Sequence, residues 1–488
     1  MSVRPPRSRN GAHGEGAAPA DSVDPRPAGA PRTSPVVILC PTAWGVRNVA
    51  HSGMLPLLSA RGVRARVLTP SVHPRNTTGG DSAAPELLPT RTAAARGDAA
   101  LGALLSASFA RRHSITTHDV FGPWMRRSLG PAGRLRHAAI DLLSTIGSRE
   151  PLYSWQRRVV EERLRRATEV APVIEQLRQM QPALLVSTTC VVRDEYPYLL
   201  AAQALEIPTL ACILSFDNLS SRGVIPKFSH YAVWNRRMRQ QLLRYYPEID
   251  GARVHVTGTP QFDFHRSDAF RWSREATLAS LGMAPDQRYL VYAANAALFT
   301  PTEPDLVRAF AGRCAELPEL RRHRIVVRPH PLDDLARWGG LADPEGRIVV
   351  SVPWEGTGPP VESDQARLVS TLLHADVCLN TASTMSLDAA ILDTPVVCVG
   401  FAAAHGTLED RFLLKAHYTE HYRPIVESGG VSLATSMEQL VHEVSAYVRD
   451  RSRGRAQRVR LVAEECGPVD GRAAERLAAL IAQLAGAP

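Results

Sequence analysis

The sequence has 488 residues, of which 44% are hydrophobic and 22% charged, and these values predict a soluble protein of two globular domains. No run of eighteen or more apolar residues occurs, and the first thirty residues carry no apolar stretch, so we expect neither a spanning helix nor a secretory signal but a cytoplasmic location. The net charge of +9 comes from 55 arginines and two lysines against 48 acids. Such a balance favours anionic ligands or a membrane surface, but no zinc-finger or RNA-binding motif accompanies it, so no nucleic-acid partner is expected.

The first part of the chain predicts a tail followed by a parallel sheet. Residues 1–34 are rich in proline, glycine, alanine and arginine without periodicity, which predicts a disordered tail. Apolar strands then alternate with helical patterns from 35 to about 265, which indicates a Rossmann-like domain with right-handed crossovers. The predicted strands are 36–40, 65–68, 183–187, 209–214, 231–234 and 254–258, and the predicted helices include 46–61, 198–205 and 236–246.

A helical insertion interrupts this first domain. Residues 70–100 predict a long polar loop, and residues 101–180 are mainly helical in pattern. Many arginines lie in the insertion, and a solvated helix face is the preferred explanation for them, with peripheral contact to a membrane surface as the alternative. Examples are Arg157, Arg158, Arg163, Arg165 and Arg166.

The second half repeats the strand–helix layout. A segment over about 259–286 leads into a second series, and residues 471–488 predict a terminal helix. The predicted strands are 289–293, 324–328, 348–352, 377–380 and 396–400. The fold class is therefore α/β, with two Rossmann-like, doubly wound domains over 35–265 and 266–470 that face a cleft. Ligands of such sheets bind beyond the carboxyl ends of the strands, where the strand order reverses.

One candidate phosphate site is the segment from His374 to Val397. It predicts a strand, a hydroxyl-rich turn, a helix and a second strand. The N-terminus of the helix and the hydroxyls of the turn suit a phosphate, and Asp388 could reach a ribose hydroxyl. An ordinary helix cap is the alternative explanation. The candidate ligand-binding residues are Asn380, Thr381, Ser383, Thr384, Ser386 and Asp388.

A second candidate follows the strand 324–328. Arg328 could pair with phosphate oxygens through its planar guanidinium, and His330 could hydrogen-bond a phosphate oxygen or protonate a leaving group. The prolines at 329 and 331 stiffen this turn, and a rigid turn with a surface histidine is the alternative. The loop after strand 289–293 adds further candidates for contact with phosphate or sugar. These are Asn295, Thr300 and Glu303.

The order of these motifs resembles the GT-B superfamily, which includes glycosyltransferases of bacterial surface polysaccharides. It is similar to glycerophosphotransferases of teichoic-acid synthesis and to bacterial sialyltransferases. The matching residues are His330-Pro331, Ser383-Thr384 and the ending Asp470–Arg476, and the resemblance covers roughly residues 180 to 480. It implies a GT-B fold in which both turns hold the phosphates of a nucleotide-activated donor.

Two residues of the first half are candidate general bases. Asp217 lies in the loop 215–223, which resembles a DN-x-[ST]-[ST]-[KR]-G loop of uncharacterised surface-carbohydrate transferases. It could take a proton or position an acceptor hydroxyl, with a loop-building Asx-turn as the alternative. His51 follows the first strand and could also be a base, although histidines on amphipathic helices are more often structural.

These candidates predict a glycosyltransferase that moves a sugar from a nucleotide sugar to a glycan, lipid-linked or small-molecule acceptor. Asp217, His51 and His330 are the catalytic candidates. A CDP-glycerol-type polyol-phosphate transferase, a sugar-nucleotide 2-epimerase and a non-catalytic GT-B-like scaffold are the alternatives. No DxD motif is evident, so we expect no metal and no other cofactor.

Overall fold

The computed structural model describes residues 34–69, 96–166, 169–221, 225–341, 346–353 and 361–486. The expected tail lies outside these residues except for Ser34, and so does most of the loop expected over 70–100. Within the described ranges, every helix is too short or too polar to cross a membrane.

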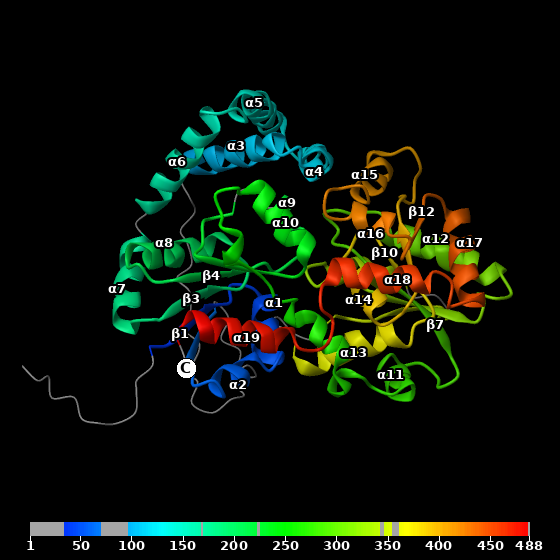
Figure 1. The fold of residues 1–488 in the computed structure, drawn as a ribbon. Coiled ribbons are helices and arrows are strands. Elements are labelled where there is room, and N and C mark those ends of the chain that lie inside the picture. The colour runs from blue at the N-terminus through cyan, green and yellow to red at the C-terminus, as the bar shows by residue number, and fades with distance from the viewer. Residues whose placement is uncertain are drawn as a thin grey trace, which may run out of the picture. The chain divides into compact units, whose positions relative to one another are not determined.

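The first sheet is wholly parallel, with the strand order β2-β1-β3-β4-β5-β6 (Figure 1). All residues of β1 and β3 are buried, as expected for central strands that helices cover on both faces. The strands are β1 (Val36–Leu39), β2 (Ala65–Leu68), β3 (Leu184–Ser187), β4 (Thr209–Cys212), β5 (His230–Val233) and β6 (Val254–Val256).

The C-terminal helix packs on this first sheet. Leu477 and Ile481 of α19 (Ala473–Leu484) join Val36 and Ile38 in one buried cluster, and Figure 1 shows α19 beside α1 and α2. Asp263 caps the helix, because its carboxylate accepts hydrogen bonds from the backbone N–H groups of residues 473 and 474 at 3.0 and 2.8 Å. The last helix therefore completes a core that the first strands begin. The other helices around this sheet are α1 (Ala43–Val46), α2 (Met54–Ser59), α7 (Val170–Met180), α8 (Tyr196–Ala204), α9 (Asn218–Ser221) and α10 (Arg236–Tyr245).

The second sheet is also parallel, with the order β12-β11-β10-β7-β8-β9. Numbered within this half, that is the doubly wound order 3-2-1-4-5-6, whose direction reverses between β7 and β10. The strands are β7 (Arg288–Ala293), β8 (His323–Arg328), β9 (Ile348–Val350), β10 (Cys378–Asn380), β11 (Val396–Val399) and β12 (Ser432–Ala434). The helices of this half are α11 (Arg274–Ser280), α12 (Glu303–Glu316), α13 (Glu362–Leu373), α14 (Met385–Ile391), α15 (Leu408–Ala416), α16 (Arg423–Glu427), α17 (Met437–Arg449) and α18 (Arg455–Leu461).

Four helices form the segment expected as an insertion, and one of them contacts the second half. Its first helix begins at Arg96, inside the stretch predicted as a loop. In α4, Trp124 stacks on Phe412 with ring centroids 4.4 Å apart, and its indole N–H donates to the carbonyl of Leu298 at 2.9 Å. The loop after β7 is therefore fastened to the insertion. The insertion helices are α3 (Arg96–Arg112), α4 (Thr116–Arg126), α5 (Pro131–Gly147) and α6 (Leu152–Arg165).

The structure differs from the prediction at two elements. The single helix expected over 46–61 is divided into α1, a π-helical turn over Arg47–His51, and α2. The break falls at Gly53, whose φ of 74° lies in the left-handed region that favours glycine. Strand β12 was not predicted, because its residues, Ser432 to Ala434, begin with a serine and are only partly buried, so they do not form an apolar run.

Candidate functional site

Three strands of the second sheet end at the same level. Ala293, the last residue of β7, pairs with Arg328 at the end of β8 and with Asn380 at the end of β10. Because neighbouring strands lie about 4.8 Å apart, the Cα atoms of Arg328 and Asn380 are about 10 Å from each other. The turns that carry His330 and Ser383 thus leave from one edge, at the point where the strand order reverses.

Arg328 is a buried cation with an unsatisfied donor. Its side chain is almost fully enclosed, and Nη2 donates to the carbonyl of Pro353 at 3.2 Å. Nη1 is buried and has no hydrogen-bond partner among the residues that the structure describes. Burial lowers the pKa of Arg328 to about 10, partly opposed by the negative charges of Asp364 and Asp388. The guanidinium therefore keeps its charge at neutral pH and pairs with no carboxylate of the described residues.

The turn after β8 presents His330 as a neutral donor. The backbone N–H of Leu332 donates to Nδ1 of His330 at 3.1 Å, which assigns the ring proton to Nε2. Burial lowers the pKa of His330, so the ring is neutral at pH 7. Asp333 fastens this turn to the loop after β7, because its carboxylate accepts from the backbone N–H of Ala297 at 3.0 Å.

His417, which the sequence analysis missed, holds the turn after β10. Its Nδ1–H donates to the carbonyl of Leu413 at 2.8 Å, and its Nε2 accepts from the backbone N–H of Ala382 at 3.2 Å. Burial lowers the pKa of His417 to about 4, so it stays neutral. Ser383 and Thr384 are half-buried at the sheet edge, and Ser383 Oγ accepts from the N–H of Met385, the first residue of α14, at 3.3 Å.

Asn380 and Ser386 lie behind the turn. Both are fully buried, and their side chains hydrogen-bond each other at 2.9 and 3.0 Å. The hydroxyl of Tyr422 lies 2.6 Å from Ser386 Oγ and closes this network. A direct contact from these two side chains to a phosphate would require the network to open. In the present arrangement they stabilise the turn.

Glu303 supports the loop after β7 from the interior. Its carboxylate accepts from Thr300 Oγ1 at 2.7 Å, from the backbone N–H of Asn295 at 3.0 Å and from the hydroxyl of Tyr292 at 3.2 Å. Thr381 Oγ1 is a more distant donor at 3.5 Å. Burial raises the pKa of Glu303 to about 7. Only 2% of the residue is exposed, so it links the loops on either side of the reversal point.

Asp388 faces the segment that connects the two sheets. Its carboxylate lies 3.1 Å from Nε2 of His265, in the 3-10 helix Pro260–Arg266, but the geometry is too poor for a hydrogen bond. Arg47 reaches the same segment from the first half, donating to the side chain of Gln261 at 3.0 Å. Burial lowers the pKa of Arg47 to about 10, and the charge of Asp388 opposes this. Asp388 thus balances buried arginines from both halves.

His51 is a half-buried, neutral imidazole. Its Nδ1 is buried without a hydrogen-bond partner in the described part of the chain. Burial lowers the pKa of His51, while Glu362 and Asp364 at the start of α13 oppose this and Arg47 adds to it. The loop after β1 therefore brings an unprotonated base within electrostatic reach of the second half.

Asp217 is engaged within its own loop. Its carboxylate accepts from Ser221 Oγ at 2.5 Å, and the neighbouring Asn218 Oδ1 accepts from the N–H of Ser215 at 2.9 Å. These contacts match the loop-building alternative. Asp217 also lies within electrostatic reach of His421, a residue that the sequence analysis did not single out. Burial lowers the pKa of His421, and the negative charge of Asp217 partly opposes this. The ring of His421 packs edge-on against Phe216, with centroids 5.1 Å apart.

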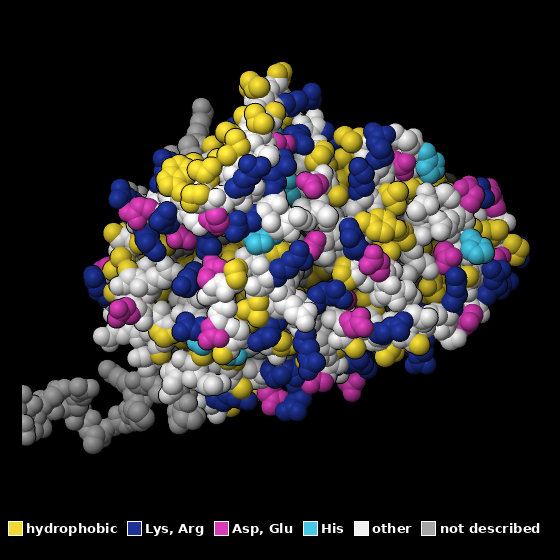
Figure 2. All heavy atoms as spheres, turned by 45° about the horizontal axis from the view of Figure 1, so that its top comes forward, with side chains coloured by type: hydrophobic (Ala, Val, Ile, Leu, Met, Phe, Trp, Pro, Cys, Tyr) yellow, Lys and Arg dark blue, Asp and Glu magenta, His cyan; other side chains and the backbone are white. Residues whose placement is uncertain are grey.

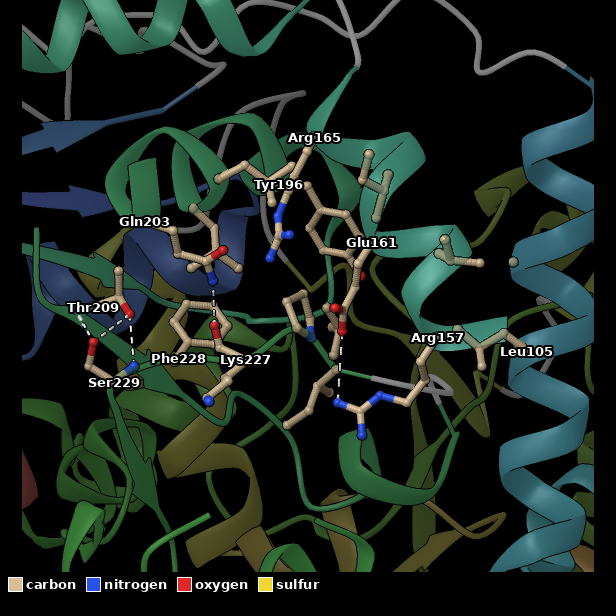
Figure 3. A pocket seen from close by; sticks show the side chains of 18 of the residues that line it. Leu105, Arg157, Glu161, Arg165, Tyr196, Gln203, Thr209, Lys227, Phe228 and Ser229 are labelled. Atoms are coloured by element: carbon tan, nitrogen blue, oxygen red, sulfur yellow. Dashed lines mark hydrogen bonds and ion pairs between the residues drawn. The ribbon is translucent and has the colours of Figure 1, made fainter. Parts of the chain in front are cut away.

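A pocket of about 450 Å³ lies apart from this edge, between the insertion and the first sheet (Figure 3). Helices α3, α6 and α8 and the segment 225–229 form its walls. None of the candidate residues from the sequence lines it.

No family model and no curated protein matches the chain. Solved structures match it in fold. A UDP-GlcNAc 2-epimerase from Methanocaldococcus jannaschii aligns at 13% identity with a TM-score of 0.54, over 92% of this chain and 99% of that chain. MnaA from S. aureus, in a co-structure with UDP, aligns at 11% identity and a TM-score of 0.52, over 91% and 94%. A putative UDP-N-acetylglucosamine 2-epimerase from Listeria monocytogenes aligns at 13% identity and 0.53, over 92% and 96%.

The fold is GT-B. Two parallel six-stranded sheets with flanking helices, matched over almost the whole of these chains, establish it. The fold expected from the HP turn and the serine-rich turn is therefore confirmed. At these identities the likeness extends to the fold and no further.

Proposed function

We propose that this GT-B chain binds a nucleotide sugar at the carboxyl edge of its second sheet and transfers the sugar to an acceptor. The buried Nη1 of Arg328 carries the proposal, because a desolvated cation whose donor has no partner among the described residues of this edge favours an anionic ligand. The Nε2–H of His330 and the hydroxyls of Ser383 and Thr384 would add neutral donors to a diphosphate. The site then matches the charge that the leaving nucleotide develops.

In the transfer, the bond between the sugar carbon and the donor phosphate oxygen breaks as the acceptor oxygen bonds to that carbon. Arg328 would stabilise the charge left on the nucleotide, and His330 would hydrogen-bond the same phosphate. The acceptor proton goes to a base. His51 is the better supported base, because it is neutral and its Nδ1 lacks a partner among the described residues, whereas Asp217 already accepts a hydrogen bond from Ser221.

The insertion supports transfer to a glycan or lipid-linked acceptor. The indole N–H of Trp124 in α4 donates a hydrogen bond to the loop after β7, which lies next to the proposed donor site. An acceptor that binds the insertion would therefore lie close to the donor loop, where closure excludes water.

A sugar-nucleotide 2-epimerase is the second candidate. The negative charges of Glu362 and Asp364 raise the pKa of His51, and the negative charge of Asp388 raises the pKa of Arg47. Carboxylates of the second half therefore lie within electrostatic reach of basic groups of the first half. Epimerisation needs acid–base groups but no acceptor.

A thermal-shift panel of UDP, CDP, CMP, GDP and TDP tests the binding step. A nucleotide at about 100 times its Kd should stabilise the protein by about 2.7 kcal/mol, and thus raise Tm by about 2 to 4 °C. The variant R328A should lose this shift. R308A, which removes an exposed arginine of α12, should keep it. Absence of a shift with every nucleotide, or equal shifts in wild type and R328A, would refute the proposed site.

Product analysis by NMR then separates the reactions. Release of nucleoside diphosphate only in the presence of an acceptor supports sugar transfer. An epimer formed from UDP-sugar alone supports the epimerase, and consumption of CDP-glycerol supports polyol-phosphate transfer. Nucleotide binding without turnover of any substrate supports the scaffold.

A further inference from the structure

Helix α5 is polar on its buried face. Ser144 and Gly147 are its buried residues, and Ser144 Oγ accepts from Nε of Arg111 in α3 at 2.6 Å. A side chain at 147 would collide with Ser108 and Gln156, so small and polar groups form the contact with α3 and α6. The packing of α5 therefore buries few of its apolar side chains.

The apolar residues of α5 lie on its exposed face. Leu135, Leu142, Leu143 and Ile146 are 73%, 71%, 51% and 53% exposed, and their spacing of i, i+7, i+8 and i+11 forms one stripe. Trp155 at the start of α6 is 53% exposed. Figure 2 shows hydrophobic side chains gathered over this part of the molecule, with arginines among them. An apolar stripe of this kind on a solvent-exposed surface marks an interaction site.

The same two helices carry excess positive charge. Residues 131–166 contain eight arginines and four acids, a net charge of +4. Among them Arg136, Arg149 and Arg158 are exposed and form no ion pair with any described residue. Arg157, in contrast, pairs with Glu248 at 2.7 Å. The arginines without an ion pair therefore lie close in sequence to the apolar stripe and to Trp155.

We propose that α5 and the start of α6 dock on an anionic membrane surface. A bilayer interface offers an apolar layer for the leucines and negative head groups for the flanking arginines, and tryptophan favours this depth. A second copy of the chain would place one positive face against another, which opposes association. Docking would bring the insertion, and with it the loop that Trp124 holds, next to lipid-borne molecules.

Co-sedimentation of the full chain with vesicles tests this docking. Wild type should bind phosphatidylcholine vesicles containing 30% phosphatidylglycerol at least tenfold more strongly than phosphatidylcholine alone. L142S/L143S should reduce that binding at least tenfold, and the exposed substitution V459S on α18 should not. R136E/R158E should abolish the preference for phosphatidylglycerol.

Two results would overturn the membrane proposal. One is equal pelleting of wild type and L142S/L143S with anionic vesicles. The other is a dimer seen by light scattering that L142S/L143S dissociates, which would assign the stripe to a second copy. An unchanged Tm in each variant controls for folding, since all substituted residues are exposed.

The pocket between the insertion and the first sheet supports a separate inference. Its walls include Leu105, Val160, Leu199 and Phe228, and Figure 3 shows the α6 residues facing Phe228 across it. Its volume of about 450 Å³ is that of a small-molecule site.

Cations surround this pocket. Arg165, Lys227 and Arg253 line it, are exposed, and form no ion pair within the described residues. Glu161, the one acid among the described lining residues, lies 3.9 Å from Arg157. We infer that the pocket binds a single-chain anionic amphiphile, with its chain along the apolar wall and its head group among the cations.

Calorimetry with monomeric dodecyl phosphate, dodecanoate and dodecanol tests the pocket. Both anions should bind at least tenfold more tightly than dodecanol, and comparison of the two separates phosphate from carboxylate head groups. K227E/R253E should abolish binding, while L142S/L143S should leave it unchanged. Equal binding of dodecanol, or binding that survives K227E/R253E, would refute the inference.

Discussion

Replacing Glu303 with glutamine should make the protein's stability less dependent on pH. Burial raises the pKa of this carboxyl from 4.5 to about 7. Between these values the folded state holds a proton that the unfolded state releases, so the free energy of unfolding falls as pH rises through this window and levels off above it. Integrating the linkage from pH 5 to pH 8 gives a loss of about 2.5 kcal/mol, which E303Q removes because an amide does not titrate.

Urea unfolding of wild type and E303Q at pH 5, 6, 7 and 8 measures this effect. Glutamine imitates the protonated carboxyl. The difference in the free energy of unfolding between E303Q and wild type should therefore be smaller at pH 5 than at pH 8. Glu195 is a matched control, since it is a buried carboxyl of the first half whose pKa burial also raises to about 7. E195Q should remove a similar slope and leave the proposed nucleotide binding unchanged. Parallel stability curves for wild type and E303Q would show that Glu303 does not titrate in this range.

Two further substitutions test the packing. W124A should lower the free energy of unfolding by about 3 kcal/mol in urea, since it removes the stack on Phe412 and the bond to the loop after β7; a loss below about 1 kcal/mol would show that α4 does not hold this loop. G467A should prevent soluble folding or lower Tm strongly, because a Cβ there would lie 2.1 Å from the carbonyl oxygen of Trp234. Its control G62A has a similar φ of 71° but open space, and should cost only about 1 kcal/mol. Similar Tm values for the two alanine variants would contradict the close contact.

The strands were predictable because parallel strands buried on both faces are short apolar runs. The edge that carries Arg328 and His330 was predictable for a related reason, since carboxyl ends of parallel strands share one side of a sheet. Periodicity could not identify His417 or His421, because each histidine contacts a turn that lies far away in the sequence. It also could not say that the apolar stripe of α5 points outward, since a period defines a face but not what the face contacts.

The position of α19 affects how the protein can form during synthesis. The first sheet emerges from the ribosome with part of one face uncovered, and Leu477 and Ile481, which cover it, are made last. A fragment that ends after β6 lacks this layer and the helix that Asp263 caps. The first half therefore completes its core only after the whole second half has been translated, so a fragment cut between the sheets would lack part of that core.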